Sequence, residues 1–223
     1  IIKILKMIYK LFMQNKDEPK NRHIELVIKN RETFLNLMPK NGVVAEVGVW
    51  RGDFAKKIID ITKPKEMYLI DPWEWLGQWK DGSDPTFNNP DEVYAEILKK
   101  FPASNNENIQ VVRTSSEIAS KNFKDEYFDW VYIDADHRYK QIQEDLHFWW
   151  PKIKEGGMLC GHDISNLFLE KEITDYEKDK NGVPRALIEF LKEIRHPNTF
   201  GIGPENLIIV GQNWAIKKIR SIG

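Results

Sequence analysis

The chain has 223 residues, enough for one large domain that buries most of the surface its unfolded form exposes. Its 33 Lys and Arg residues nearly balance 34 Asp and Glu residues, so the net charge of −1 excludes a long-range field for collecting nucleic acid or an anionic membrane. The single cysteine, Cys160, excludes an intrachain disulfide and favours a reducing compartment, so we expect a cytoplasmic protein.

The beginning of the chain is predicted to be helical. Residues Ile1 to Met13 mix apolar side chains with three lysines in an amphipathic pattern. This helix could dock on the protein's own body or on a second copy in a homo-oligomer, cover a binding site as a lid, or lie on a membrane surface. A second helix is predicted from about Ile24 to Leu37. We therefore expect an N-terminal helical segment at residues 1–40 and the main ligand-binding domain at residues 41–223.

No apolar stretch approaches the roughly 18 residues that suggest a transmembrane segment. From residue 43 onward, short apolar runs alternate with helical stretches, a pattern typical of βαβ units and a mostly parallel sheet. Strands are expected at Val43–Val47, Met67–Ile70, Ile109–Val112, Trp130–Ile133 and Met158–Cys160. Helices are expected at Phe54–Ile61, Val93–Phe101, Ser116–Asn122 and Gln141–Trp149.

The end of the chain predicts an antiparallel hairpin. Leu207–Val210 and Trp214–Ile216 flank Gly211-Gln212-Asn213, a turn-forming triplet. The complete pattern predicts a doubly wound α/β fold whose seven-stranded, mostly parallel sheet closes with this hairpin. A dinucleotide dehydrogenase, by contrast, normally ends with further parallel units.

Two segments interrupt the regular alternation. Trp73 to Asp91 contains three tryptophans among Gly, Pro and Asn residues, so it either contacts a ligand or folds back on its own tryptophans. Glu170 to Lys180 is a charged insertion that could act as a substrate lid. We assign Trp149 and Trp150 to the core, because they end an amphipathic helix.

The first strand leads into a glycine-containing turn with an acidic residue. Glu46-Val47-Gly48-Val49-Trp50-Arg51-Gly52 lacks the three glycines of a dinucleotide fingerprint, and a carboxylate would repel a phosphate. A carboxylate suits a cationic ligand such as S-adenosylmethionine, which carries a sulfonium and an ammonium group. We expect Glu46, Gly48, Trp50 and Gly52 to contact this cofactor, although an ordinary strand-to-helix turn stays open as the alternative.

The second and third strands end in further candidate cofactor residues. Asp71 could accept hydrogen bonds from both ribose hydroxyls, and Trp73 could cover the adenine face. Ser115 or Ser116 is expected to cap the next helix. The same serines could also meet the adenine edge.

The fourth and fifth strands are expected to be neighbours, about 4.8 Å apart. Asp134 follows the fourth strand, and His162 and Asp163 follow the fifth. These side chains would leave an uncompensated negative cluster unless a divalent metal, Mg or Mn, binds there. A hydrogen-bonded polar network is the alternative.

Three motifs resemble a known family. They are Phe128-Asp129-Trp130-Val131-Tyr132-Ile133-Asp134-Ala135-Asp136-His137-Arg138-Tyr139, Asp145-Leu146-x-x-Trp149-Trp150-Pro151 and Gly156-Gly157-x-x-x-Gly161-His162-Asp163. They are similar to the Rossmann-like class I methyltransferases related to macrocin and mycinamicin sugar O-methyltransferases. The resemblance implies Asp134 and Asp163 as magnesium ligands and His137 as general base. His162 departs from the family, which has a carboxylate there, and a nitrogen ligand favours manganese, iron or zinc.

We therefore expect an S-adenosylmethionine-dependent, metal-assisted O-methyltransferase acting on a hydroxyl of a sugar or small natural product. Asp134 and His137 are the candidate catalytic residues, and Asp134 also borders the cofactor. The expected partner is a small-molecule acceptor, not nucleic acid. Two other readings stay open: a metal-dependent oxygenase or hydrolase that uses Asp134, His162 and Asp163, and a non-catalytic nucleoside-binding subunit.

Overall fold

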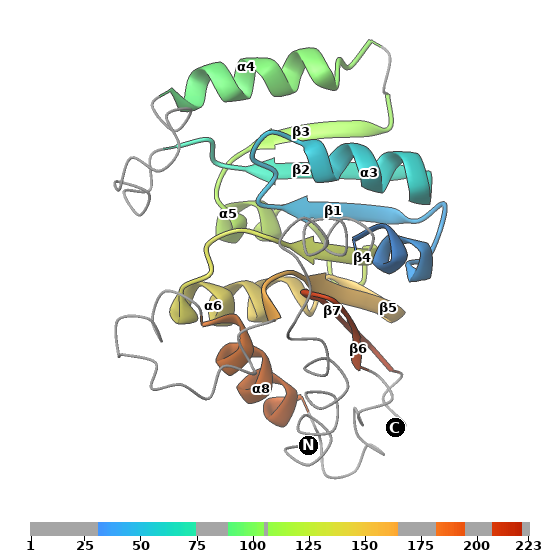
Figure 1. Ribbon diagram of the computed structural model, residues 1–223, viewed down its shortest axis with the longest axis vertical. Helices are drawn as coiled ribbons and strands as arrows, with labels where there is room; N and C mark the ends of the chain where they lie inside the picture. Colours follow the sequence, from blue (N-terminus) through green and yellow to red (C-terminus); the bar gives the residue numbers. More distant parts are fainter. Residues whose placement is uncertain (1–30, 75–88, 105–106, 165–181, 195–206, 220–223) are drawn as a thin grey trace, which may run out of the picture.

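The computed structural model describes residues 31–74, 89–104, 107–164, 182–194 and 207–219 (Figure 1). Three expectations lie wholly or mostly outside these residues: the amphipathic helix at Ile1–Met13, the charged insertion at Glu170–Lys180 and most of the tryptophan-rich segment at Trp73–Asp91. Among the described residues, no helix is long and apolar enough to cross a membrane.

The seven strands form one sheet with the order β3-β2-β1-β4-β5-β7-β6 (Figure 1). Their bounds are β1 Val43–Val47, β2 Glu66–Asp71, β3 Ile109–Arg113, β4 Phe128–Ile133, β5 Ile153–Gly161, β6 Leu207–Val210 and β7 Asn213–Lys217. Strands β1 to β5 pair in parallel, and β7 pairs antiparallel with both β5 and β6. The predicted seven-stranded sheet with a closing hairpin is confirmed.

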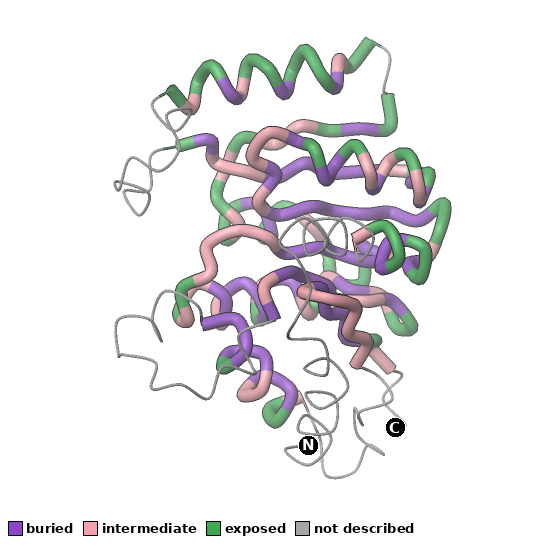
Figure 2. Tube along the Cα trace, in the orientation of Figure 1, coloured by how far each residue is buried: buried purple, intermediate pink, exposed green. Residues whose placement is uncertain are grey.

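Helices cover both faces of the sheet, as expected for a doubly wound fold. Their bounds are α3 Asp53–Thr62, α4 Pro90–Lys100, α5 Ser116–Lys121, α6 Tyr139–Trp149 and α8 Val183–Glu193. One core cluster joins the sheet to α3, α4 and the helical residues 31–37, and the other joins it to α5, α6 and α8. Strand β1 is buried along its whole length (Figure 2), which fits a central strand covered on both faces.

The helical residues 31–37 pack against the sheet. Phe34 and Leu35 are fully buried and belong to the same cluster as α3 and α4. Trp149 is fully buried in the other cluster, which confirms its assignment to the core, whereas Trp150 is partly buried and packs against that same cluster. Part of the chain before residue 41 therefore shares its core with the sheet.

Two elements, β5 and α4, begin three or more residues earlier than the sequence predicts. Strand β5 starts at Ile153 instead of Met158 and includes Gly157, where an added Cβ would lie 2.6 Å from the carbonyl oxygen of Asp129. Glycine weakens a strand in isolation, but here it permits this close approach beside an irregularity in the β4–β5 register. Helix α4 starts at Pro90, because the side chain of Asn89 caps it.

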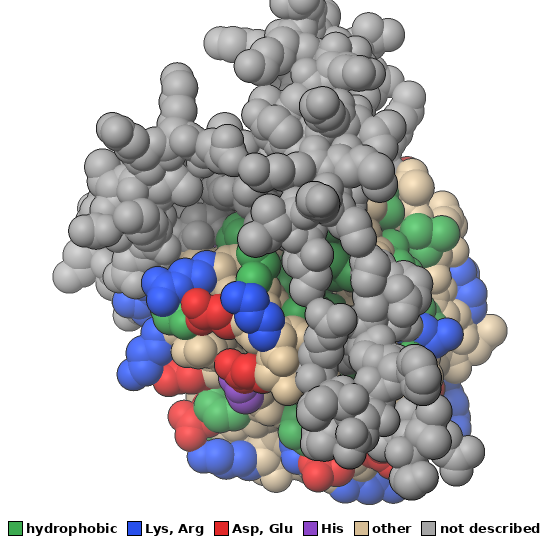
Figure 3. All heavy atoms as spheres, turned by 90° about the horizontal axis from the view of Figure 1, so that it is seen from below, with side chains coloured by type: hydrophobic (Ala, Val, Ile, Leu, Met, Phe, Trp, Pro, Cys, Tyr) green, Lys and Arg blue, Asp and Glu red, His purple; other side chains and the backbone are tan. Residues whose placement is uncertain are grey.

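Charged side chains of both signs lie side by side on the face drawn in Figure 3. Ion pairs on α6 and α8 include His147 with Glu193 at 2.8 Å and Arg185 with Glu189 at 3.2 Å. Pairs this exposed contribute little to stability, about 0–1 kcal/mol each.

A buried carboxyl group links α5 to α6. Ser116 donates its hydroxyl to Asp145, and the indole of Trp149 donates to the Ser116 hydroxyl at 2.8 Å. Asp145 is 6% exposed, and its burial, aided by the charges of Asp136 and Glu144, raises its pKa to about 7 despite the hydrogen bond from Ser116. The folded protein therefore holds a proton on Asp145 that the unfolded chain releases near pH 4.

We expect Asp145→Asn to stabilise the protein above pH 7. The folded pKa is raised, so wild-type stability falls as pH rises from about 4 to about 7 and then stays level. The amide still accepts from Ser116 but cannot ionise, so its advantage grows over this window to at most about 4 kcal/mol. Urea unfolding between pH 4.5 and 8 measures it, with exposed Asp60→Asn as control. A stability difference independent of pH would contradict the assignment.

Candidate functional site

The turn between β1 and α3 contains three residues with left-handed backbone angles, Gly48, Trp50 and Gly52. At Gly48, an added Cβ would lie 2.3 Å from the carbonyl oxygen of Asp134. This glycine therefore lets the turn after β1 approach the end of β4, its neighbour in the sheet. The sequence predicted a sharp turn here, and the contact with Asp134 explains why one of its glycines is needed.

Asp71, at the end of β2, organises the same turn. Its Oδ2 accepts hydrogen bonds from the backbone N–H groups of Val49 and Trp50, both at 2.9 Å, and its Oδ1 accepts from that of Trp73 at 2.7 Å. Burial raises the pKa of Asp71, and these three hydrogen bonds oppose the rise. A carboxylate offers about four acceptor positions, so acceptor capacity remains for a ligand hydroxyl.

Trp73 is only 2% exposed, and its indole N–H donates to the carbonyl oxygen of Trp50 at 2.9 Å. Its ring packs against Tyr94 of α4, with 5.1 Å between ring centroids. The structure thus places Trp73 in the core beside the turn, whereas Trp50 is half-buried.

Ser115 and Ser116 have different partners at the start of α5. Ser115 is the N-cap, and its side chain accepts from the backbone N–H of Ile118 at 3.4 Å, as the sequence predicted for one of the two serines. The Ser116 hydroxyl contacts Asp145 and Trp149 of α6. Both hydroxyls therefore already contribute to the structure of the protein itself.

Glu46 is the most unusual acidic residue near the turn. It is 1% exposed on β1, and its Oε2 has no hydrogen-bond partner among the described residues. Burial raises its pKa well above the ordinary value; the charge of Asp134 raises it further, while Arg31 opposes the rise. A buried carboxyl oxygen without a partner carries a desolvation cost, which a bound cation would reduce.

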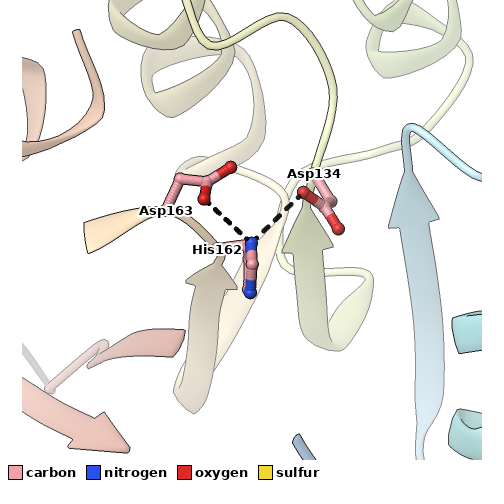
Figure 4. Close-up of side chains that lie close together, drawn as sticks. All are labelled: Asp134, His162 and Asp163. Carbon is pink, nitrogen blue, oxygen red and sulfur yellow. Dashed lines mark ion pairs between the residues drawn. The ribbon is translucent and has the colours of Figure 1, made fainter. Parts of the chain in front are cut away.

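Asp134, His162 and Asp163 come together at the adjacent ends of β4 and β5 (Figure 4). One ligand atom from each residue lies within 4.8 Å of the others. The imidazole Nδ1 of His162 is 3.2 Å from Asp163 Oδ1 and 3.9 Å from Asp134 Oδ1, so it sits between the two carboxylates. This is the group of three that the sequence predicted.

His137 contacts the same two carboxylates. Its Nε2 is 3.4 Å from Asp134 Oδ1 and 3.1 Å from Asp163 Oδ2. Burial alone would lower the pKa of His137, but the hydrogen bond with Asp134 and the charge of Asp163 raise it overall. For Asp163, burial raises the pKa, but the hydrogen bond from His162 and the charge of His137 lower it overall.

Backbone contacts fix the loops that carry these side chains. The carbonyl oxygen of His137 accepts from the N–H of Gly182 at 2.7 Å, and that of His162 accepts from the indole of Trp214 at 3.0 Å. At Gly182, an added Cβ would lie 2.0 Å from the Cα of Tyr139. The start of α8 is therefore packed directly against the start of α6, next to His137.

Arg31 also belongs to this site, although its sequence context did not predict it. Its Nη2 lies 3.2 Å from Asp134 Oδ2, and its guanidinium lies over the Phe54 ring, 4.7 Å from the centroid. Burial alone would lower the pKa of Arg31, but surrounding acidic groups, including Asp134, Glu46 and Asp163, raise it overall. The acidic group, formed by Asp134, His162 and Asp163, is therefore in contact with a cation from the protein itself. The sequence predicted an uncompensated negative cluster here, and the structure shows one that Arg31 partly compensates.

Comparison with known proteins identifies one matching family, described as a methyltransferase domain, over residues 45–164. The matched segment begins in β1 and ends just after Asp163, so it contains both the turn and the cluster at β4 and β5. No curated protein matches the sequence.

Three solved structures have similar folds. A protein from Corynebacterium glutamicum has a TM-score of 0.53 and 12% identity, with 99% of this chain and 98% of that chain covered. An SAH-bound methyltransferase from Podospora anserina has a TM-score of 0.53 and 13% identity, with coverage of 98% and 87%. An rRNA methylase from Streptococcus thermophilus has a TM-score of 0.52 and 12% identity, with coverage of 86% and 96%. At these identities the likeness shows the shared fold.

Proposed function

Because the chain belongs to the methyltransferase domain family, we propose that it transfers the methyl group of S-adenosylmethionine to a hydroxyl group of a small molecule, such as a sugar or natural product. The observation that carries this proposal is the buried, unpartnered Oε2 of Glu46 beside the turn after β1. This atom suits a positively charged ligand group better than a phosphate. The SAH-bound relative from Podospora anserina supports the choice of donor.

In this proposal the donor lies across the carboxyl ends of β1 and β2. Glu46 accepts from its ammonium group, while the backbone of Gly48, Trp50 and Gly52 borders its chain. Beyond its three backbone hydrogen bonds, Asp71 keeps about one acceptor position, which would take one of the ribose hydroxyls. The adenine ring is proposed to lie next to Trp73 and to contact the backbone of Ser115 and Ser116.

The donor set of Asp134, His162 and Asp163 fits a divalent ion, because two carboxylates and an imidazole nitrogen already converge there. The nitrogen ligand favours manganese over magnesium. A bound ion would supply Lewis-acid chemistry by lowering the pKa of an acceptor hydroxyl.

Methyl transfer requires the acceptor oxygen to lie in line with the methyl carbon and the sulfur. The oxygen–carbon bond forms as the carbon–sulfur bond breaks, which releases S-adenosylhomocysteine, and the hydroxyl proton must leave. We assign that proton to Nε2 of His137. The nearby carboxylates of Asp134 and Asp163 would stabilise the resulting imidazolium, in agreement with the raised pKa of His137.

The family membership does not favour an oxygenase or hydrolase built on Asp134, His162 and Asp163. A nucleoside-binding subunit without activity would bind the donor but transfer no methyl group. A survey of candidate acceptors with methyl-labelled donor distinguishes this reading from the proposed enzyme.

Calorimetric titration with S-adenosylmethionine tests the donor assignment directly. We expect saturable binding of one molecule per chain, with an affinity lowered by added S-adenosylhomocysteine, because both nucleosides would use the same ribose and adenine contacts. Adenosine diphosphate serves as the control, since its phosphates would be repelled by the acidic turn. No binding of the donor, or equally tight binding of the diphosphate, would reject the proposal.

A further inference from the structure

Arg31 contacts Asp134 in the folded protein, although the two residues are 103 positions apart in the sequence. The helical residues 31–37 are held against the sheet by the buried side chains of Phe34 and Leu35. The guanidinium of Arg31 then reaches Asp134 while lying over Phe54. The side chains of Arg31 and Asp134 are only 25% and 18% exposed, so solvent screens this pair less than a surface pair.

The positive charge of Arg31 acts on the carboxylates that would bind a metal. Arg31 holds Oδ2 of Asp134, while Oδ1 of the same carboxylate faces His162. A divalent ion bound to Asp134 would therefore share its ligand with a guanidinium and would be repelled by it. Arginine keeps its charge at every physiological pH, so this repulsion cannot be relieved by loss of a proton.

A second observation also bears on metal affinity. A metal-bound histidine normally donates its other ring N–H to a carboxylate, a carbonyl group or water. The Nε2 of His162 is buried and has no hydrogen-bond partner among the residues that the structure describes. No described side chain or carbonyl group therefore strengthens His162 as a ligand.

We propose that Arg31 is a built-in cation that neutralises Asp134 and thereby limits how tightly the group of Asp134, His162 and Asp163 binds a divalent metal. Arg31 is thus a positioning residue that determines metal affinity from the helical residues 31–37. The proposal rests on the metal-binding role that the proposed function gives to Asp134, His162 and Asp163, but it does not depend on the methyl donor. Its test is therefore made without donor, and donor titration stays a separate experiment.

The test is a titration of the full chain with manganese chloride, followed calorimetrically and by the electron paramagnetic resonance signal of free Mn²⁺. We expect Arg31→Gln to bind Mn²⁺ at least about tenfold more tightly than wild type, equivalent to about 1.4 kcal/mol. Arg31→Lys should stay within about twofold of wild type, because it keeps the charge. Adding Asp163→Asn to Arg31→Gln should remove the gain.

Glu32→Gln is the matched control, because Glu32 joins the same helical segment to Lys57 of α3 at 3.2 Å but does not contact the acidic group. It should leave Mn²⁺ affinity unchanged. Arg31→Met keeps the apolar contact with Phe54, so it replaces Arg31→Gln if the glutamine variant fails to fold. Unchanged or weaker Mn²⁺ binding in a folded charge-free variant, or no binding by any variant, would overturn the proposal.

Discussion

Glu46→Gln is expected to weaken binding of S-adenosylmethionine about a hundredfold. The substitution keeps the size of the side chain but removes the negative charge that would face the donor's ammonium group. Losing one partner of a buried, charge-assisted pair costs about 2–5 kcal/mol, and a hundredfold loss of affinity, about 2.7 kcal/mol, lies in this range. Calorimetric titration of both proteins with the donor measures the effect.

The same variant should be more stable than wild type when no donor is bound. Burial raises the pKa of Glu46, so the folded state holds its proton more tightly than the unfolded chain does. Wild-type stability therefore falls as pH rises above the unfolded pKa of about 4.3, and glutamine removes this loss. Thermal unfolding at pH 5 and pH 8 should show a larger gain at pH 8.

Glu66→Gln provides a control for Glu46→Gln, because Glu66 lies at the opposite end of β2 from Asp71 and accepts a hydrogen bond from Tyr127 at 2.7 Å. Its donor affinity should match that of wild type. If Glu46→Gln binds the donor as well as wild type does, Glu46 does not contact it. The central support for the proposed function would then be lost.

The core strands were predictable because burial leaves a strong local signal. Strand β1 is covered by helices on both faces, so its sequence is a short run of mostly apolar residues between turn signals. The early start of β5 was not predictable, because Gly157 reads as a break until the carbonyl group of Asp129 is seen beside it. The position of β7 between β5 and β6 also depends on pairing between distant residues.

The candidate site was predictable where strand ends carry it. Parallel neighbours end at the same edge of a sheet, so Asp134 was expected beside His162 and Asp163, and the structure places them together. Contacts made by backbone groups or by distant helices were hidden. Nothing in the sequence around Arg31 indicates its pair with Asp134, and nothing around Asp71 indicates its hydrogen bonds to Val49 and Trp50.

The contacts that Arg31 and His137 make with Asp134 and Asp163 reduce the need for a bound metal at this site. From the sequence, two carboxylates at neighbouring strand ends favoured a bound metal over a hydrogen-bonded polar network. In the structure, Arg31 and His137 already contact these carboxylates. Removal of the acceptor's hydroxyl proton can therefore be tested on the protein's own side chains, without assuming a bound metal. His137 is the residue to substitute.

His137→Ala is expected to lower turnover at least about a thousandfold while donor affinity stays within about twofold of wild type. General base catalysis contributes about 10²- to 10⁴-fold, and His137 is the proposed acceptor of the hydroxyl proton. The rate is measured with methyl-labelled donor and an acceptor found in the survey. Added imidazole should restore part of the lost rate, because a free base can occupy the space left by the side chain.

His147→Ala is the matched control, because His147 lies exposed on α6, where it contacts Glu193 and the backbone of Gln143. It should keep wild-type turnover. A loss of donor binding in His137→Ala would mean that His137 maintains the shape of the donor site through Asp134 and Asp163. A fall in rate that imidazole cannot reverse, with donor binding intact, would point to a role in holding those carboxylates and not in taking the proton.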